Sequence, residues 1–109
     1  MVGGKLWTQR DRYGNDIYLT AERWQHITDP DNHPDIEPFA EYVRETVRNG
    51  RREQVPLQPD TYRYIREFDN LPDYQTHVVV VVVFRRGVLP GDGTPQGNFV
   101  VTAYLKEID

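Results

Sequence analysis

The sequence predicts an α+β domain in which two N-terminal helices pack on a four-stranded antiparallel meander. Three observations favour this fold. Residues 76–84 (T-H-V-V-V-V-V-V-F) contain six consecutive valines, and such β-branched side chains fit a strand better than a helix. Residues 35–49 carry apolar side chains at helical spacing. Segments rich in strand-forming residues then follow one another with short connections.

The chain has the size of one domain. It contains 109 residues, 38% of them hydrophobic, and no cysteine, so we expect a single domain over residues 1–109 that folds without disulfides. Residues 1–10 are expected to form either a flexible arm or an edge strand. No segment looks like a signal peptide or a transmembrane helix, which predicts a soluble cytoplasmic protein that does not act on a membrane.

Residues 21–27 are predicted to form the first helix. Thr20 is a suitable N-cap, and Glu22 favours the positive end of the helix dipole. Trp24 and Ile27 would face the core. The turn residues at 29–32 (D-P-D-N) would then end the helix.

Residues 35–49 are predicted to form a second, amphipathic helix. Pro38 is tolerated because it falls in the first turn, and Gly50 stands where a helix often ends on glycine. The apolar positions, spaced three and four residues apart, are Ile36, Phe39, Ala40, Val43 and Val47.

Four strands are predicted after the helices, at residues 51–55, 61–68, 76–84 and 98–105, with a long hairpin loop at 87–97. The valine strand is apolar on both faces, so it should be central, with both faces covered by helices or by a curled sheet. We expect it to pair with residues 61–68 and 98–105. Side chains on the face without helices would then meet in a concavity, where we expect the chemistry.

The charge of the chain argues against one class of function, broad and nonspecific nucleic-acid binding. A net charge of −4 and a pI near 5.3 argue against broad, nonspecific nucleic-acid binding, which depends on cationic side chains. Eleven of the thirteen basic residues are arginine, and six of these lie in residues 44–66 with only three acidic residues. Because guanidinium suits phosphate and carboxylate, a local anion site is one interpretation, and solvent-exposed ion pairs are the other.

Two histidines are candidates for proton transfer. His26 and His33 flank one turn, and an imidazole can act as a general acid or a general base near neutral pH. For either histidine alone, a capping or loop hydrogen bond is the simpler interpretation. An arginine, Arg63 or Arg52, could stabilise the charge that develops on a phosphate.

Hydroxyl groups complete the candidate site. Thr102 and Tyr104 lie two residues apart, so their side chains share one face of the last strand. We predict catalytic roles for His26, His33, Arg63, Thr102 and Tyr104, and substrate binding by Arg52, Tyr62 and Tyr64. The chain contains no P-loop, no G-x-S-x-G elbow and no H-E-x-x-H motif.

These residues together resemble a known family. The resemblance rests on the order of His26-Ile27, His33-Pro34, a helix, a strand bearing Tyr and Arg, the valine run and a closing V-V-T-A-Y. The chain resembles the phage-type branch of the Barnase-EndoU-colicin E5/D-RelE (BECR) nuclease superfamily. The resemblance covers roughly residues 11–105. It implies the two-helix, four-strand fold described above, and RNA cleavage by attack of the 2′-hydroxyl on the adjacent phosphate, without a metal or any other cofactor.

The resemblance also implies roles and partners. His26 and His33 would share the acid and base roles, Arg63 or Arg52 would hold the phosphate, and the two hydroxyl residues of the last strand would orient the substrate. The function implied is that of an endoribonuclease, as a toxin or an RNA-processing domain. RNA is the expected substrate, with an antitoxin or immunity protein, or a second copy of the chain, as the protein partner.

Two other hypotheses compete. The chain could be a noncatalytic interaction domain on the same scaffold, pairing with another protein or with itself through Tyr62, Tyr64 and Phe68. Convergence of the two histidines and Thr102 on one open pocket with an arginine would separate the nuclease from this alternative.

The second alternative is a metal site made by His26 and His33 with Asp29 or Asp31. This segment lacks a recognised spacing of zinc ligands.

Overall fold

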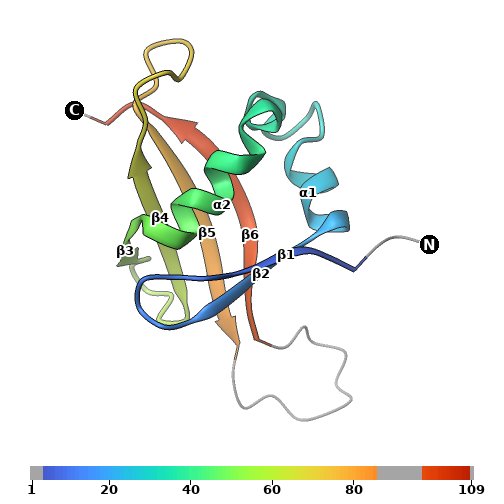
Figure 1. The fold of residues 1–109 in the computed structure, drawn as a ribbon, viewed down its shortest axis with the longest axis vertical. Helices are drawn as coiled ribbons and strands as arrows, with labels where there is room; N and C mark the ends of the chain where they lie inside the picture. The colour runs from blue at the N-terminus through green and yellow to red at the C-terminus, as the bar shows by residue number, and fades with distance from the viewer. Residues whose placement is uncertain (1–3, 86–96, 109) are drawn as a thin grey trace.

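A mixed six-stranded sheet organises the chain, in the order β1-β2-β6-β5-β4-β3 (Figure 1). The computed structural model describes residues 4–85 and 97–108. The strands are β1 (Lys5–Arg10), β2 (Asp16–Thr20), β3 (Arg51–Gln54), β4 (Thr61–Glu67), β5 (His77–Arg85) and β6 (Gly97–Lys106). The helices are α1 (Ala21–Ile27), α2 (Ala40–Asn49) and a 3-10 helix, η1 (Pro34–Phe39). The loop predicted at 87–97 lies, apart from Gly97, outside the described residues.

The valine strand β5 is confirmed, and it lies between β4 and β6 with antiparallel pairing on both sides. Val78, Val80 and Val82 are fully buried on the side that carries the helices. Val79 is also buried, on the opposite side, but Val81 is only partly buried. The two faces are therefore covered unequally, and we call the face without helices the open face.

The predicted four-stranded meander beneath two N-terminal helices is wrong, because two strands precede the helices. β1 and β2 form an antiparallel hairpin, and β2 then pairs in parallel with β6 through Ile17 with Asn98 and Tyr18 with Phe99. β2 alternates buried and partly exposed side chains, as a strand does, but it has only five residues. Its parallel partner β6 lies at the other end of the chain, so no local signal reveals this pairing. Within the sheet, β3 to β6 remain consecutive antiparallel neighbours.

The first helix is confirmed at its predicted bounds. Thr20 caps α1, since its Oγ1 accepts a hydrogen bond of 3.0 Å from the Arg23 amide. The second predicted helix is divided into η1 and α2. Pro38 falls inside η1, beyond the first turn in which it was expected to be tolerated, and it has no amide hydrogen with which to continue α-helical bonding. Throughout residues 4–85 and 97–108, no helix has the length and apolarity needed to cross a membrane.

The core lies between the sheet and two covering elements. In Figure 1, α2 crosses one face of the sheet, and the β1–β2 hairpin crosses the same side nearer one end of the strands. Ile17 and Leu19 of the hairpin, with Val43 and Val47 of α2, pack with the buried valines of β5. Burial of these side chains supplies the main stabilisation of the fold.

One extra residue in β6 changes which side chains face the helices. Val81 pairs with Thr102 whereas Val82 pairs with Val100, so Val101 forms a β-bulge. Val100 before the bulge and Ala103 after it are both buried on the helix side.

Gly50 is required by packing and not by its backbone dihedrals. It follows α2 with φ −68° and ψ 153°, an extended conformation that any residue can adopt. A Cβ atom at this position would overlap the Thr46 carbonyl oxygen and lie 3.0 Å from the Ile65 carbonyl oxygen. The glycine therefore lets α2 end directly against β4.

We expect Gly50→Ala to lower the free energy of unfolding by about 1–3 kcal/mol, because backbone atoms must move to admit the methyl group. Chemical denaturation followed by circular dichroism measures this change. Gly4→Ala is the matched control, since a Cβ there meets no atom within 4 Å. Equal stability of the two variants would contradict the packing requirement.

Candidate functional site

Three predicted catalytic residues share the open face. Arg63 of β4 and Thr102 of β6 both lie opposite Val81, so they form one row across three strands. Tyr104 lies in the next row, opposite Val79. Side chains that are aligned across neighbouring strands project to the same face of a sheet. Arg63, Thr102 and Tyr104 therefore share one face of the sheet. The expected convergence of His26, His33 and Thr102 on one pocket with an arginine is not found, because the hollow on this face is lined by Arg63 and Tyr104 but not by these three residues, and His26 lines a separate hollow.

A hollow of about 270 Å³ lies on this face. Within it Glu53 pairs with two arginines, at 3.4 Å from Arg63 Nη1 and 3.3 Å from Arg51 Nη1. Its lining residues are Arg51, Glu53, Arg63, Ile65, Val79, Tyr104, Lys106, Glu107 and Ile108. The three cationic side chains outnumber the two carboxylates, so the hollow suits an anion even though the whole chain carries −4.

His33 does not line this hollow, but its ring packs against Tyr104, which does. The two ring centroids are 5.5 Å apart with an interplanar angle of 33°. The His33 amide donates to the Ile27 carbonyl oxygen at 2.9 Å. The bond fixes the chain where it leaves α1 and so holds the imidazole next to β6.

His26 occupies a different place. It is exposed at the end of α1 and lines a separate hollow of about 640 Å³, together with Tyr18, Thr20, Glu22, Arg23, Phe99 and Val100. The turn between the histidines satisfies its own polar groups, since Asp29 Oδ1 accepts from the Asp31 amide and Asn32 Nδ2 donates to the His26 carbonyl oxygen. Among the residues that the structure describes, no three His, Cys, Asp or Glu side chains gather as a metal site.

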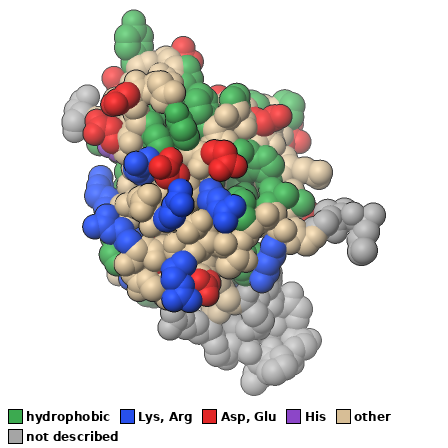
Figure 2. Space-filling model, in the orientation of Figure 1, with side chains coloured by type: hydrophobic (Ala, Val, Ile, Leu, Met, Phe, Trp, Pro, Cys, Tyr) green, Lys and Arg blue, Asp and Glu red, His purple; other side chains and the backbone are tan. Residues whose placement is uncertain are grey.

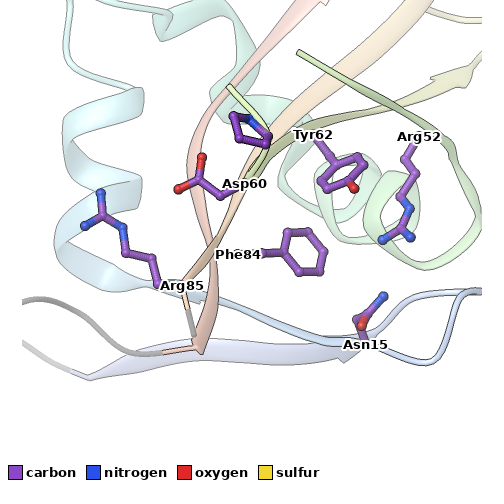
Figure 3. A pocket seen from close by; sticks show the side chains of 7 residues that line it. Asn15, Arg52, Asp60, Tyr62, Phe84 and Arg85 are labelled. Carbon is purple, nitrogen blue, oxygen red and sulfur yellow. The ribbon is translucent and has the colours of Figure 1, made fainter. Parts of the chain in front are cut away.

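The predicted substrate-binding residues lie on the helix-covered face. Arg52 is paired with Tyr64 and projects to the side opposite Arg63. The guanidinium of Arg52 stacks 4.6 Å from the centre of the Tyr62 ring. Both side chains line a third hollow, of about 690 Å³, with Asn15, Pro59, Asp60, Phe84 and Arg85 (Figure 3). We call this the Arg52 hollow.

Tyr64 is fully buried, so its side chain does not reach a ligand. Its hydroxyl donates to Asp11 Oδ2, and the Asp11 side chain is itself fully buried. Burial, followed by the bond to Asp11, raises the pKa of Tyr64 well above its ordinary value, although Arg52 opposes the shift. The role of this residue is to tie the β1–β2 turn to β4.

Phe68, the third residue of the suggested interaction surface, is also used within the chain. Its ring stacks on Tyr42 at 4.2 Å and 5°, and the Arg66 guanidinium lies 4.6 Å from its centre. With Tyr64 buried and Tyr62 against Arg52, these aromatic residues do not form an exposed apolar patch.

Charged side chains are unevenly distributed on the helix-covered face. In Figure 2 the basic side chains gather across the middle and lower part of this face, whereas the acidic ones lie mainly toward the top. A local excess of positive charge therefore coexists with an acidic chain.

Sequence reasoning missed Asp11, Glu53 and Phe84. Asp11 has a recognisable signal, since an aspartate opening a glycine-containing turn often accepts backbone hydrogen bonds, and it does accept them from Tyr13 and Asn15. Nothing in the sequence singles out Glu53, because its place between two arginines of the open face depends on strand register. Phe84 was recognised only as the end of the valine strand.

No protein family, curated protein or solved structure matches the chain. The function of the site is therefore inferred from the geometry of this chain alone.

We expect Tyr64→Phe to lower the free energy of unfolding by about 1–3 kcal/mol, since it removes a donor from a buried carboxylate. The raised pKa of Tyr64 also predicts that stability is retained below pH 10, the ordinary tyrosine value, and declines above it, because the unfolded chain loses the proton first. Denaturation at several pH values measures both effects.

Tyr74→Phe is the matched control, because the Tyr74 side chain is 87% exposed. The alkaline decline should be smaller in Tyr64→Phe than in Tyr74→Phe. If both variants match the parent chain, Tyr64 does not hold the turn.

Proposed function

We propose that the chain is a metal-independent endoribonuclease domain, a toxin or RNA-processing module, whose reaction takes place on the open face. The observation that carries the proposal is the position of Tyr104. Its ring packs against His33 and also lines the hollow that contains Arg63. A phosphate-binding cation and a hydroxyl group thus line one cavity, and a proton carrier contacts the residue that bears the hydroxyl, which are the groups that this chemistry uses.

Each group has a role in the reaction. Arg63 binds the phosphate and stabilises the charge that develops on its oxygens. The 2′-oxygen attacks the adjacent phosphorus, the bond to the 5′-oxygen breaks, and a 2′,3′-cyclic phosphate and a 5′-hydroxyl result. A base accepts the proton of the 2′-hydroxyl, and an acid donates a proton to the departing 5′-oxygen. Tyr104 and Thr102 orient the strand.

His33 supplies one of the two proton transfers, and two groups compete for the other. The family resemblance favours His26. The geometry favours Glu53, which lies in the same hollow as Arg63, whereas His26 lines a separate one. With Glu53 as base and His33 as acid, one proton carrier lines the hollow that holds the phosphate, and the other contacts Tyr104, which also lines it.

Arg63→Gln is expected to reduce cleavage of single-stranded RNA by about 100-fold or more in excess chelator, and His33→Ala by a similar factor. Product ends are identified as 2′,3′-cyclic phosphates by mass spectrometry. Arg66→Gln is the matched control. Arg66 lies on the same strand and also pairs with a glutamate at 3.4 Å, but it projects to the other face.

Intact RNA with the parent chain would reject the proposal and favour a noncatalytic binding domain. Equal loss in Arg63→Gln and Arg66→Gln would reject the open face as the site.

The second proton carrier is identified by comparing two further variants under the same conditions. We expect Glu53→Gln to reduce cleavage by about 100-fold and His26→Ala to have little effect. The reverse result would assign the role to His26.

A further inference from the structure

We propose that the Arg52 hollow is a separate binding site for a nucleoside phosphate, either a free nucleotide or one unit of a single RNA strand. The site lies on the helix-covered face, whereas the proposed reaction takes place on the open face. It does not depend on the proposed ribonuclease activity. Its volume of about 690 Å³ falls within the usual range for small-molecule sites.

Three aromatic rings hold the guanidinium of Arg52 in place. It lies 4.4 Å from the centre of the Tyr13 ring, 4.6 Å from Tyr62 and 5.6 Å from Phe84. Stacking against ring faces fixes the plane of a guanidinium while its N–H groups point outward around the edge. The arginine is therefore preorganised to bind an anion.

The carboxylate nearest to Arg52 is already fully occupied. Asp11 Oδ1 accepts from the amides of Tyr13 and Asn15, and Oδ2 accepts from the Tyr64 hydroxyl and the Asn15 side chain. Four hydrogen bonds use the acceptor capacity of a carboxylate. Arg52 Nη1 is 4.0 Å from Asp11 Oδ2, which is too long for a hydrogen bond. Arg52 also hydrogen-bonds to the Tyr64 hydroxyl. Because a guanidinium has five N–H donors, Arg52 keeps others for a phosphate, and its side chain is 25% exposed.

Tyr62 and Phe84 provide a surface for a base. Their ring centroids are 5.3 Å apart at 71°, so the pair offers both an edge and a face. Figure 3 shows the two rings between Arg52 on one side and Arg85 on the other. Proteins that bind single-stranded nucleic acid without sequence preference commonly combine cationic groups with aromatic rings on which the bases stack.

The remaining charges suit a nucleotide better than a simple anion. Arg85 also lines the hollow, although its guanidinium lies 6.0 Å from the centre of the Phe99 ring and points away from Tyr62 and Phe84 in Figure 3, and Asp60 gives the hollow one carboxylate. Phosphate would bind at Arg52, and the Asp60 carboxylate can accept a hydrogen bond from a base or a ribose hydroxyl. Inorganic phosphate lacks the aromatic contact, and a nucleoside lacks the charge.

The test is a titration of the full chain with the four nucleoside 5′-monophosphates, followed by NMR chemical shifts. We expect shifts at residues of the hollow, and the best nucleotide to bind at least tenfold more tightly than its nucleoside or inorganic phosphate. A 2′-O-methyl RNA hexamer, which cannot be cleaved, distinguishes the sources: tighter binding of the hexamer indicates an RNA strand, and weaker binding indicates a free nucleotide.

Substitutions assign the binding to this hollow. Arg52→Gln and Phe84→Leu should each weaken nucleotide binding at least tenfold, and the exposed Arg85→Gln, which is expected to fold normally, about threefold. Arg48→Gln, an exposed arginine of α2, is the control and should leave binding unchanged. Unchanged affinity in Arg85→Gln and Phe84→Leu, or equal binding of nucleotide and phosphate, would overturn the proposal. Loss of RNA cleavage would not affect it.

Discussion

The hydrogen bond between Asp11 and Tyr64 joins two parts of the chain that are 53 residues apart. Because both side chains are buried, this contact excludes water and closes the β1–β2 turn over β4. The β1–β2 turn also places the Tyr13 ring 4.4 Å from the guanidinium of Arg52, and this contact orders the arginine. One buried polar contact therefore links the stability of the fold to the shape of a surface hollow, as polar groups inside proteins often do.

The alternation of side chains along the strands separates two kinds of surface. Odd-numbered residues of β4 face the open side, where Arg63 meets Glu53. Even-numbered residues face the helix-covered side, where Tyr62 lies near Arg52 beneath the hairpin. Arginines that are close in the sequence thus serve opposite sides of one sheet. A cluster of arginines in a β-rich segment cannot be assumed to form a single patch.

Features that depend on a few neighbouring residues could be predicted from the sequence. The valine run, the Thr20 cap and the spacing in α2 act locally, and β5, α1 and α2 follow from them. The shared face of Thr102 and Tyr104 also follows from strand periodicity. The parallel pairing of β2 with β6 joins residues that are 81 positions apart, Ile17 with Asn98 and Tyr18 with Phe99, and no local pattern encodes it. The contact of His33 with Tyr104 could not be predicted for the same reason.

The bulge at Val101 decides where β6 can lose a residue without changing the faces of its side chains. Removing or adding one residue in a regular strand inverts every side chain beyond that point. In β6 the extra residue is already present, so Val100 and Ala103 both face inward while Thr102 faces outward. Loss of Val101 would place Thr102 directly after Val100, so regular alternation would keep Val100 and Ala103 inward and Thr102 outward, each with its present partner on β5. A deletion at the bulge is therefore more acceptable than a deletion in the regular part of β6, which would invert the side chains beyond it or slide the strand along β5.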